Sequence, residues 1–261
     1  MGAGRRYARR AALVAVAILL GGCAGHGPAP AGSSAPAGSA YSTVALGDSV
    51  PAGTACHCVP YPEVAASSLT VAGSREVSAA NDAVGGYTTE DVLAQVRSRP
   101  DVSSRVAQAD VVEIEVGAND VAHSRSCGTA AACYAPGVST VEHNLGEIVA
   151  RVRELTQGHR TLVVLLDYWS VWLGGQYAQD QGTAYVDAAA RVTDEVNSVI
   201  KQTAAKTGSA YVDLRAAFKG PDYAYDETHY LASDGDHPNE AGHRQIAAAL
   251  VDVITKTLHV G

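Results

Sequence analysis

The chain has 261 residues, 47% of them hydrophobic, which suits one α/β domain with a buried core and is too few for two good-sized domains. Acidic residues outnumber basic ones by 27 to 19. This balance, without a basic run in the folded part, argues against nucleic acid as a partner and disfavours electrostatic adhesion to anionic lipid.

The first 22 residues have the pattern of an export signal. Four arginines within the first ten residues precede an uninterrupted apolar run at 11–20, which is too short to span a bilayer as a helix. Leu20-Gly21-Gly22-Cys23 then resembles a bacterial lipobox, in which the cysteine is acylated and becomes the mature N-terminus. We therefore predict a lipoprotein signal peptide at 1–22, lipidation of Cys23 and an extracytoplasmic protein anchored to the cell membrane. Plain secretion is the alternative, and the export route stays open.

Residues 23–40 consist almost entirely of Gly, Ala, Pro and Ser. Such a composition buries too little apolar surface to order itself, so this segment is predicted to be a tether. The folded domain is then expected to occupy residues 41–261.

From Tyr41 onwards, apolar strands alternate with amphipathic helices, which is typical of a parallel sheet covered on both faces. Thr88 or Thr89 can cap one helix with its side-chain oxygen. Glu90 and Asp91 in the first turn of that helix suit the helix dipole. In chain order we expect strands at 42–46 and 76–80, a helix from that cap to Arg97, a strand at 110–116, a helix at 141–156, a strand at 161–167, a helix at 185–207, a strand at 210–214 and a last helix at 239–258.

Four cysteines remain once Cys23 is set aside: Cys56, Cys58, Cys127 and Cys133. In an exported protein they indicate two disulfides, with three possible pairings. Cys127 and Cys133 close a short loop comfortably. Pairing Cys56 with Cys58 makes a tight ring, so a cross-link between the two loops stays open. A metal site at Cys56, His57 and Cys58 is the weaker alternative, because an oxidising compartment favours disulfides over zinc.

Polar motifs stand at four boundaries of the expected elements. Gly47-Asp48-Ser49, Asn81–Thr89 and Gly117–Asp120 each follow a strand, and Asp234–Asn239 precedes the last helix. Each alone is an ordinary turn sequence. In a doubly wound sheet, however, ligands bind at the carboxyl ends of the strands, so the four motifs in this order predict one site.

This set of motifs resembles the SGNH hydrolases, also called GDSL esterases and lipases, over residues 41–258. The resemblance implies a flavodoxin-like three-layer α/β/α sandwich with a five-stranded parallel sheet. It also implies Ser49 as nucleophile, Asp234 and His237 as its partners, and an oxyanion hole made by Ser49, Gly86 and Asn119. The sequence departs from the family pattern at Val50, where Leu gives the family its name, and at Ala118, where Gly is frequent. Neither position carries a catalytic group.

The chemistry of these residue types supports the same roles. A serine hydroxyl needs a base within hydrogen-bond reach, and a histidine can both take and return its proton near neutral pH. A carboxylate such as Asp234 fixes the tautomer of that histidine and stabilises the imidazolium. Three preorganised donors to the developing oxyanion would each be worth about 2.7–4 kcal/mol.

The sequence therefore predicts a carboxylic ester hydrolase that works through an acyl-enzyme on Ser49 and needs no cofactor or metal. Short-chain acyl or acetyl esters, on small molecules or glycans, are favoured, because no strongly apolar lid of the kind expected in a lipase is evident. An acyltransferase acting on cell-envelope glycan with the same triad, and a lipase, remain alternatives. A non-catalytic envelope binding protein is less favoured, because all three triad residues are kept. An α/β-hydrolase fold is disfavoured, because no Gly-x-Ser-x-Gly elbow is present.

Two further groups of residues have open interpretations. Aromatic side chains after the fourth and fifth strands could line a substrate wall or simply pack the loops. They are Tyr168, Trp169, Trp172, Tyr177, Tyr223, Tyr225 and Tyr230. His229, Asp236 and His243 lie near the triad loop, but no paired-histidine spacing of a zinc enzyme occurs there, so a metal cluster is not favoured.

Overall fold

The structure is a computed structural model that describes residues 41–73 and 76–258. The signal peptide, the tether and the lipidation site at Cys23 lie outside these residues and stay predictions from sequence. Within the described ranges, no helix combines the length and the apolar character needed to cross a membrane.

Five parallel strands form the sheet of the described region, in the order β2-β1-β3-β4-β5. This is the flavodoxin-like order, and the predicted three-layer α/β/α fold is confirmed. Each predicted strand is present within two residues of its expected ends. The strands are β1 (Tyr41–Gly47), β2 (Val77–Asn81), β3 (Val111–Glu115), β4 (Leu162–Leu166) and β5 (Ala210–Val212).

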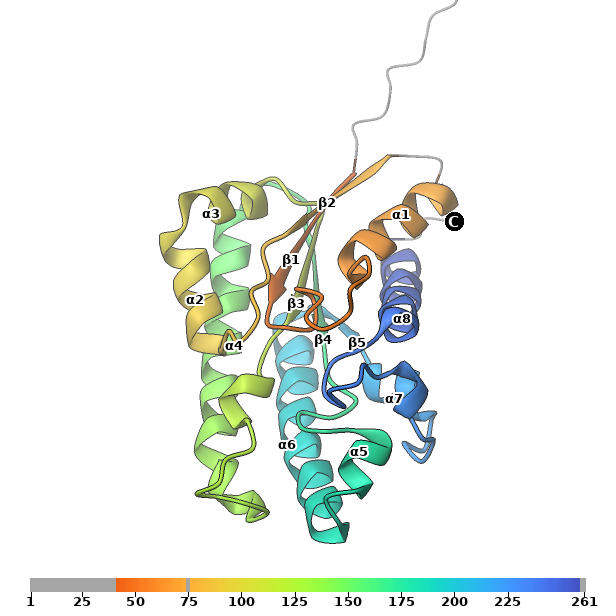
Figure 1. The fold of residues 1–261 in the computed structure, drawn as a ribbon. Coiled ribbons are helices and arrows are strands. Elements are labelled where there is room, and N and C mark those ends of the chain that lie inside the picture. The colour runs from red at the N-terminus through yellow and green to blue at the C-terminus, as the bar shows by residue number, and fades with distance from the viewer. Residues whose placement is uncertain (1–40, 74–75, 259–261) are drawn as a thin grey trace, which may run out of the picture. The chain divides into compact units, whose positions relative to one another are not determined.

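Helices cover both faces of the sheet (Figure 1). On one face α1 (Tyr61–Gly73) packs against α8 (Glu240–Leu258), which also contacts α7 (Leu214–Lys219). On the other face α4 packs between α2 and α6. These helices and the remaining two are α2 (Thr89–Ser98), α3 (Pro100–Ala107), α4 (Ala135–Leu155), α5 (Gly175–Gln179) and α6 (Thr183–Thr207).

The predicted helix starting at Thr88 or Thr89 is confirmed as α2, capped by Thr88. The Thr88 side chain accepts from the backbone N–H of Asp91, and the Asp91 side chain accepts in return from the N–H of Thr88. Such a reciprocal pair satisfies two backbone donors at the helix start. The local signal was therefore sufficient to place this end.

Other helices depart from the expectation. α4 begins at Ala135, six residues earlier than predicted, because Pro136 fits the first turn of a helix, where no N–H is needed. α1 was not predicted, since its small and β-branched residues form no clear apolar stripe. Packing against α8 stabilises α1 instead, and the spacing of apolar residues along the chain cannot predict such a tertiary contact.

The structure pairs Cys56 with Cys58 and Cys127 with Cys133, with Cα separations of 5.1 and 5.6 Å. The cross-link between the two loops is thus not formed. His243 lies close to the first disulfide, and its ring nitrogen and the two sulfurs are within 4.8 Å of one another. The N–H of Tyr61 donates to Nδ1 of His243 at 3.2 Å, which places the ring hydrogen of the neutral imidazole on Nε2. With the sulfurs bonded to each other, these atoms are not arranged as metal ligands.

Candidate active site

Ser49 lies in the loop that follows β1, at the carboxyl edge of the sheet. Its carbonyl accepts from the N–H of Thr54 at 3.0 Å, and the carbonyl of Val50 accepts from Gly53 at 3.0 Å, so the loop is a series of tight turns. Gly47 starts this loop with φ +154°, and a Cβ there would collide with the carbonyl oxygen of Glu115 on β3. Only glycine therefore lets the chain leave β1 at this point.

Asp48 fixes the loop that contains Ser49 through two hydrogen bonds. Its side chain is completely buried, accepts from the N–H of Val50 at 3.1 Å and accepts from the hydroxyl of Tyr168 at 2.6 Å. Burial raises the pKa of Asp48 to about 6, while the two hydrogen bonds act in the opposite direction. Asp48 thus ties the loop after β1 to the loop after β4, as a structural neighbour of Ser49.

Asp234 and His237 form a hydrogen-bonded pair within one loop. Nδ1 of His237 lies 2.8 Å from Oδ2 of Asp234, and Oδ1 of Asp234 accepts from the N–H groups of Asp236 and His237, both at 3.1 Å. Partial burial acts to raise the pKa of Asp234, but the hydrogen bonds from His237 and Asp236 outweigh it, and the pKa is lowered. The ionised carboxylate holds Nδ1–H, which leaves Nε2 of His237 to accept a proton.

Asn239 holds the ends of this loop together and starts α8. Its Nδ2 donates to the carbonyls of His229 and Leu231, both at 2.9 Å. Its Oδ1 accepts from the N–H groups of Ala241 and Gly242 in the first turn of α8. One side chain thereby caps the helix and fixes the position of the Asp234–His237 loop.

Asn119 and Gly86 lie in two loops that are joined by a hydrogen bond. Nδ2 of Asn119 donates one hydrogen to the carbonyl of Tyr87 at 2.9 Å, so the second amide hydrogen remains available. The N–H of Tyr87 donates to the carbonyl of Val84, which closes a turn with Gly86 at φ +85°. This is the left-handed position of a type II turn, which favours glycine. The predicted oxyanion residues are therefore held on a common framework.

Ser49, Asn119 and His237 line one pocket of about 370 Å³. Three side chains that are far apart in the sequence are thus brought together at the carboxyl ends of β1 and β3 and at the start of α8. No hydrogen bond joins the side chains of Ser49 and His237 in the described part of the chain. Catalytic hydrogen bonds are often long before substrate binds, so the lack of this bond does not argue against a serine–histidine pair.

The family model of the GDSL-like lipase/acylhydrolase family matches residues 45–245, a range that contains all of these site residues. The chain belongs to this family. Carboxylic ester hydrolysis is accordingly its reaction class. The match begins within β1 and ends within α8, so it includes the end of β1 and the whole of the other four strands.

Solved structures agree with this family fold. A lipase from a goat rumen metagenome superposes with a TM-score of 0.65 at 20% identity, covering 82% of this chain and 97% of that one. A lipase/acylhydrolase from Enterococcus faecalis gives 0.58 at 20% identity, covering 83% and 96%. The acetylxylan esterase Axe2 from Geobacillus stearothermophilus gives 0.61 at 22% identity, covering 84% and 95%. A search of curated proteins gives no significant match.

The pocket of this GDSL-family chain has aromatic walls that the sequence indicated only in part. Of the aromatic residues weighed from sequence, Tyr168, Trp169 and Trp172 line it. The sequence analysis missed His123 and Tyr185. Their ring centroids lie 4.8 and 5.4 Å from that of Trp172 and 5.2 Å from each other. No local signal marks Tyr185, whereas His123 could have been suspected because it follows Asn119 in the same loop.

The remaining aromatic residues have other positions. Tyr177 packs beside Gly235 in the triad loop, and Tyr225 lines a second hollow. Tyr223 and Tyr230 line neither of these two cavities. Of the two aromatic stretches considered from sequence, the one after β4 contributes to the lining of the pocket and the one after β5 does not.

None of the described residues that line the pocket is a lysine or an arginine. Asp236 lines it beside His237, and desolvation of its carboxyl raises the pKa of Asp236 while the nearby His237 lowers it. An anionic ester would meet this carboxylate, and no lysine or arginine of the lining could pair with the charge of the ester.

Proposed function

We propose that this chain is a serine esterase that hydrolyses short-chain acyl esters, with acetyl groups on glycans as the favoured class. Ser49 is the nucleophile, His237 its base and Asp234 the group that orients the base. The observation that carries the proposal is that Ser49, Asn119 and His237 line one pocket, while Oδ2 of Asp234 lies 2.8 Å from Nδ1 of His237.

The reaction runs in two halves. Oγ of Ser49 attacks the ester carbonyl while Nε2 of His237 takes the hydroxyl proton, and the tetrahedral intermediate forms. His237 then returns the proton to the leaving alcohol, which gives the acyl-enzyme. Water attacks the acyl carbonyl while His237 takes its proton; the bond from the acyl carbon to Oγ of Ser49 then breaks, His237 returns the proton to Oγ, and the free acid leaves. Asp234 stays ionised throughout and stabilises the imidazolium.

The N–H groups of Ser49 and Gly86 and the free amide hydrogen of Asn119 are the proposed oxyanion donors. The hydrogen bond from Nδ2 of Asn119 to the carbonyl of Tyr87 supports this role, because it fixes the amide before substrate arrives. A preorganised donor needs no rearrangement when charge develops on the oxygen.

Asn119→Ala is expected to lower kcat about 10²- to 10³-fold with little change in KM, because this donor acts mainly in the transition state. Steady-state hydrolysis of p-nitrophenyl acetate measures the effect. Since the substitution also removes the contact with Tyr87, thermal unfolding is followed alongside. An unchanged kcat in a variant that is folded at the assay temperature would remove Asn119 from the oxyanion hole.

A short acyl group suits the mixture of polar and aromatic side chains around the pocket. His123, Gln181 and Asp236 line it together with Trp172 and Tyr185. The similar structures include an acetylxylan esterase and a lipase. A long acyl chain would have to cover these polar groups without satisfying their hydrogen bonds, which opposes binding.

Hydrolysis of p-nitrophenyl esters from acetate to palmitate tests the proposed function. We expect kcat/KM to be highest for acetate or propionate and to fall steadily for longer chains. Labelling by a fluorophosphonate probe reports the reactive serine in the same samples. If the folded, oxidised chain neither hydrolyses any ester of the series nor reacts with the probe, the esterase proposal is wrong.

A further inference from the structure

One hydrogen bond joins the segment that carries the proposed nucleophile to the segment that carries its base. The N–H of Tyr61, at the start of α1, donates to Nδ1 of His243 on α8 at 3.2 Å, and both side chains are completely buried. Among the described residues this is the only hydrogen bond between 49–61 and 234–258. The side chains of Ser49 and His237 are not bonded to each other, so their spacing depends on contacts of this kind.

On the side of the base, His243 is closely joined to the loop of His237. The N–H of His243 donates to the carbonyl of Asn239 at 2.9 Å, and the side chain of Asn239 holds the ends of that loop. The neighbouring Gly242 packs against Pro238, which directly follows His237. A Cβ on Gly242 would lie only 2.7 Å from the Cβ of Pro238. A displacement of His243 is therefore expected to displace the base as well.

On the side of the nucleophile, Tyr61 is joined to the loop of Ser49. Pro60 packs against Gly53, where a Cβ would lie 2.6 Å from Cγ of the proline. The N–H groups of Gly53 and Thr54 close the tight turns that begin at Ser49, each with a hydrogen bond of 3.0 Å. The Ser49 loop and the start of α1 therefore form one packed unit, which meets His243 through the N–H of Tyr61.

The imidazole of His243 is in the state that this bond requires. Burial lowers the pKa of His243 to about 4, and the nearby His237 acts in the same direction, so the ring is neutral at neutral pH. One nitrogen of the ring and the sulfurs of Cys56 and Cys58 lie within 4.8 Å of one another, so the disulfide packs beside the ring.

Packing alone does not account for a histidine at this position. With Nδ1 as the acceptor for Tyr61, the ring hydrogen lies on Nε2, which has no hydrogen-bond partner among the described residues. A buried N–H without an acceptor costs stability, and a leucine would fill similar space without that cost. The feature that leucine would lack is the acceptor at Nδ1.

We propose that His243 is a positioning residue of the esterase, which sets the spacing of Ser49 and His237 through its hydrogen bond to the N–H of Tyr61. His243 does not line the catalytic pocket, so it acts through the two loops and not on the substrate. The inference rests on the proposed roles of Ser49 and His237. A misplacement of about 1 Å can lower a rate about 10²-fold, so a bond remote from the ester can affect kcat and leave KM unchanged.

Three substitutions of His243 separate its acceptor from its bulk. His243→Asn keeps an acceptor oxygen at the place of Nδ1, His243→Gln carries its oxygen further out, at the place of Nε2, and His243→Leu has no acceptor. For p-nitrophenyl acetate, kcat is expected to fall about 10- to 10²-fold in the Leu and Gln variants, with KM within about twofold of the parent. His243→Asn should recover kcat to within about threefold of the parent. The rate of fluorophosphonate labelling should fall and recover in parallel.

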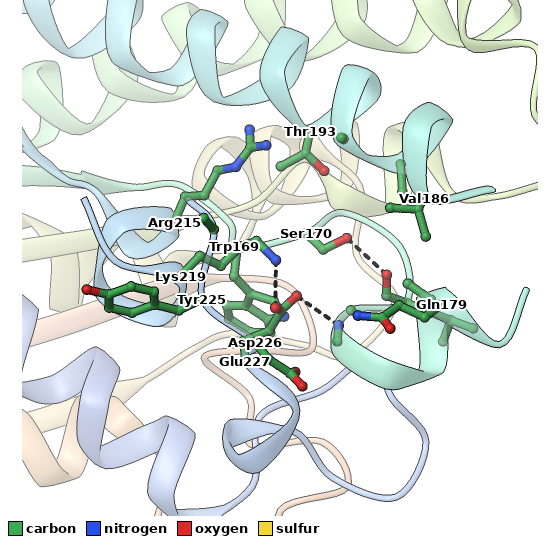
Figure 2. Close-up of a pocket in the computed structure, with 17 residues that line it drawn as sticks. Trp169, Ser170, Gln179, Val186, Thr193, Arg215, Lys219, Tyr225, Asp226 and Glu227 are labelled. Carbon is green, nitrogen blue, oxygen red and sulfur yellow. Dashed lines mark hydrogen bonds and ion pairs between the residues drawn. The ribbon is translucent and has the colours of Figure 1, made fainter. Parts of the chain in front are cut away.

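A variant that is destabilised elsewhere separates positioning from stability. Arg215 on α7 lines a second hollow of about 170 Å³ beside Trp169 (Figure 2), and it pairs with Asp194 on α6. This ion pair joins neither the Ser49 loop nor the His237 loop. Arg215→Met should therefore unfold at a lower temperature and keep the parent kcat. Thermal unfolding of every variant fixes an assay temperature at which all of them are folded.

Two results would overturn the inference and leave the esterase intact. One is the parent kcat in a folded His243→Leu protein, with His243→Gln in its place if the leucine variant does not fold. The other is a loss of kcat in His243→Asn as large as in His243→Leu, since the acceptor would then be irrelevant. A parent chain that neither hydrolyses the ester nor reacts with the probe would instead refute the proposed function.

Discussion

Ser49→Ala is expected to lower kcat for p-nitrophenyl acetate by about 10⁴- to 10⁶-fold, because the acyl-enzyme cannot form without the hydroxyl. The residual rate would come from the oxyanion donors and from substrate positioning. His237→Ala should lose activity to a similar extent, and the double variant should be hardly worse than either single one. Groups that act as one unit show this non-additivity, whereas independent groups would multiply their effects.

Three measurements make this result decisive. Ser139→Ala, at an exposed serine on α4, controls for the loss of a hydroxyl as such. Fluorophosphonate labelling should disappear in Ser49→Ala and persist in Ser139→Ala. Thermal unfolding shows whether each variant is folded. A folded Ser49→Ala protein with more than a tenth of the parent activity would exclude Ser49 as the nucleophile.

The second large effect concerns stability, because buried carboxyl groups lie beneath the site. Glu113 on β3 is completely buried, and neither oxygen of its carboxyl has a hydrogen-bond partner among the described residues. Burial, assisted by the nearby Glu63, raises the pKa of Glu113 from an ordinary 4.5 to about 8. The pKa of Asp167 is raised to about 7, and that of Glu115 is raised well above its usual range, in both cases mainly by burial.

A raised pKa in the folded state means that the folded chain binds a proton that the unfolded chain has released. The stability that Glu113 contributes is therefore complete below pH 4.5 and is lost as the pH rises through about 8. Each pH unit in this interval lowers the free energy of unfolding by about 1.4 kcal/mol, or about 5 kcal/mol over the whole interval.

Glu113→Gln should remove this loss, because the amide resembles the protonated acid and does not titrate. The free energy of unfolding of the variant, relative to the parent, is expected to rise by several kcal/mol between pH 4.5 and 8. Urea unfolding at intervals of half a pH unit measures it. Glu195→Gln, at an exposed position on α6, should follow the parent curve. A constant difference between Glu113→Gln and the parent at all pH values would show that Glu113 does not titrate in this range.

The sequence by itself determined the strands and the motifs that lie at their ends. A buried parallel strand is a continuous apolar run such as Leu162–Leu166, and it can be recognised without knowing its neighbours. The motifs containing Ser49, Asn119 and His237 stand directly at element boundaries, so their convergence at one sheet edge followed from the fold class. Local capping chemistry likewise located the start of α2 at Thr88.

Only the tertiary structure decided which distant groups meet. The hydrogen bond from Tyr168 to Asp48 and the position of the Tyr185 ring beside Trp172 depend on how segments that follow different strands approach one another. The same holds for α1, which is stabilised by α8, and for the hollow beside Trp169. Periodicity and spacing report on neighbours along the chain. Contacts across the sheet depend instead on strand order and loop packing, which no local pattern encodes.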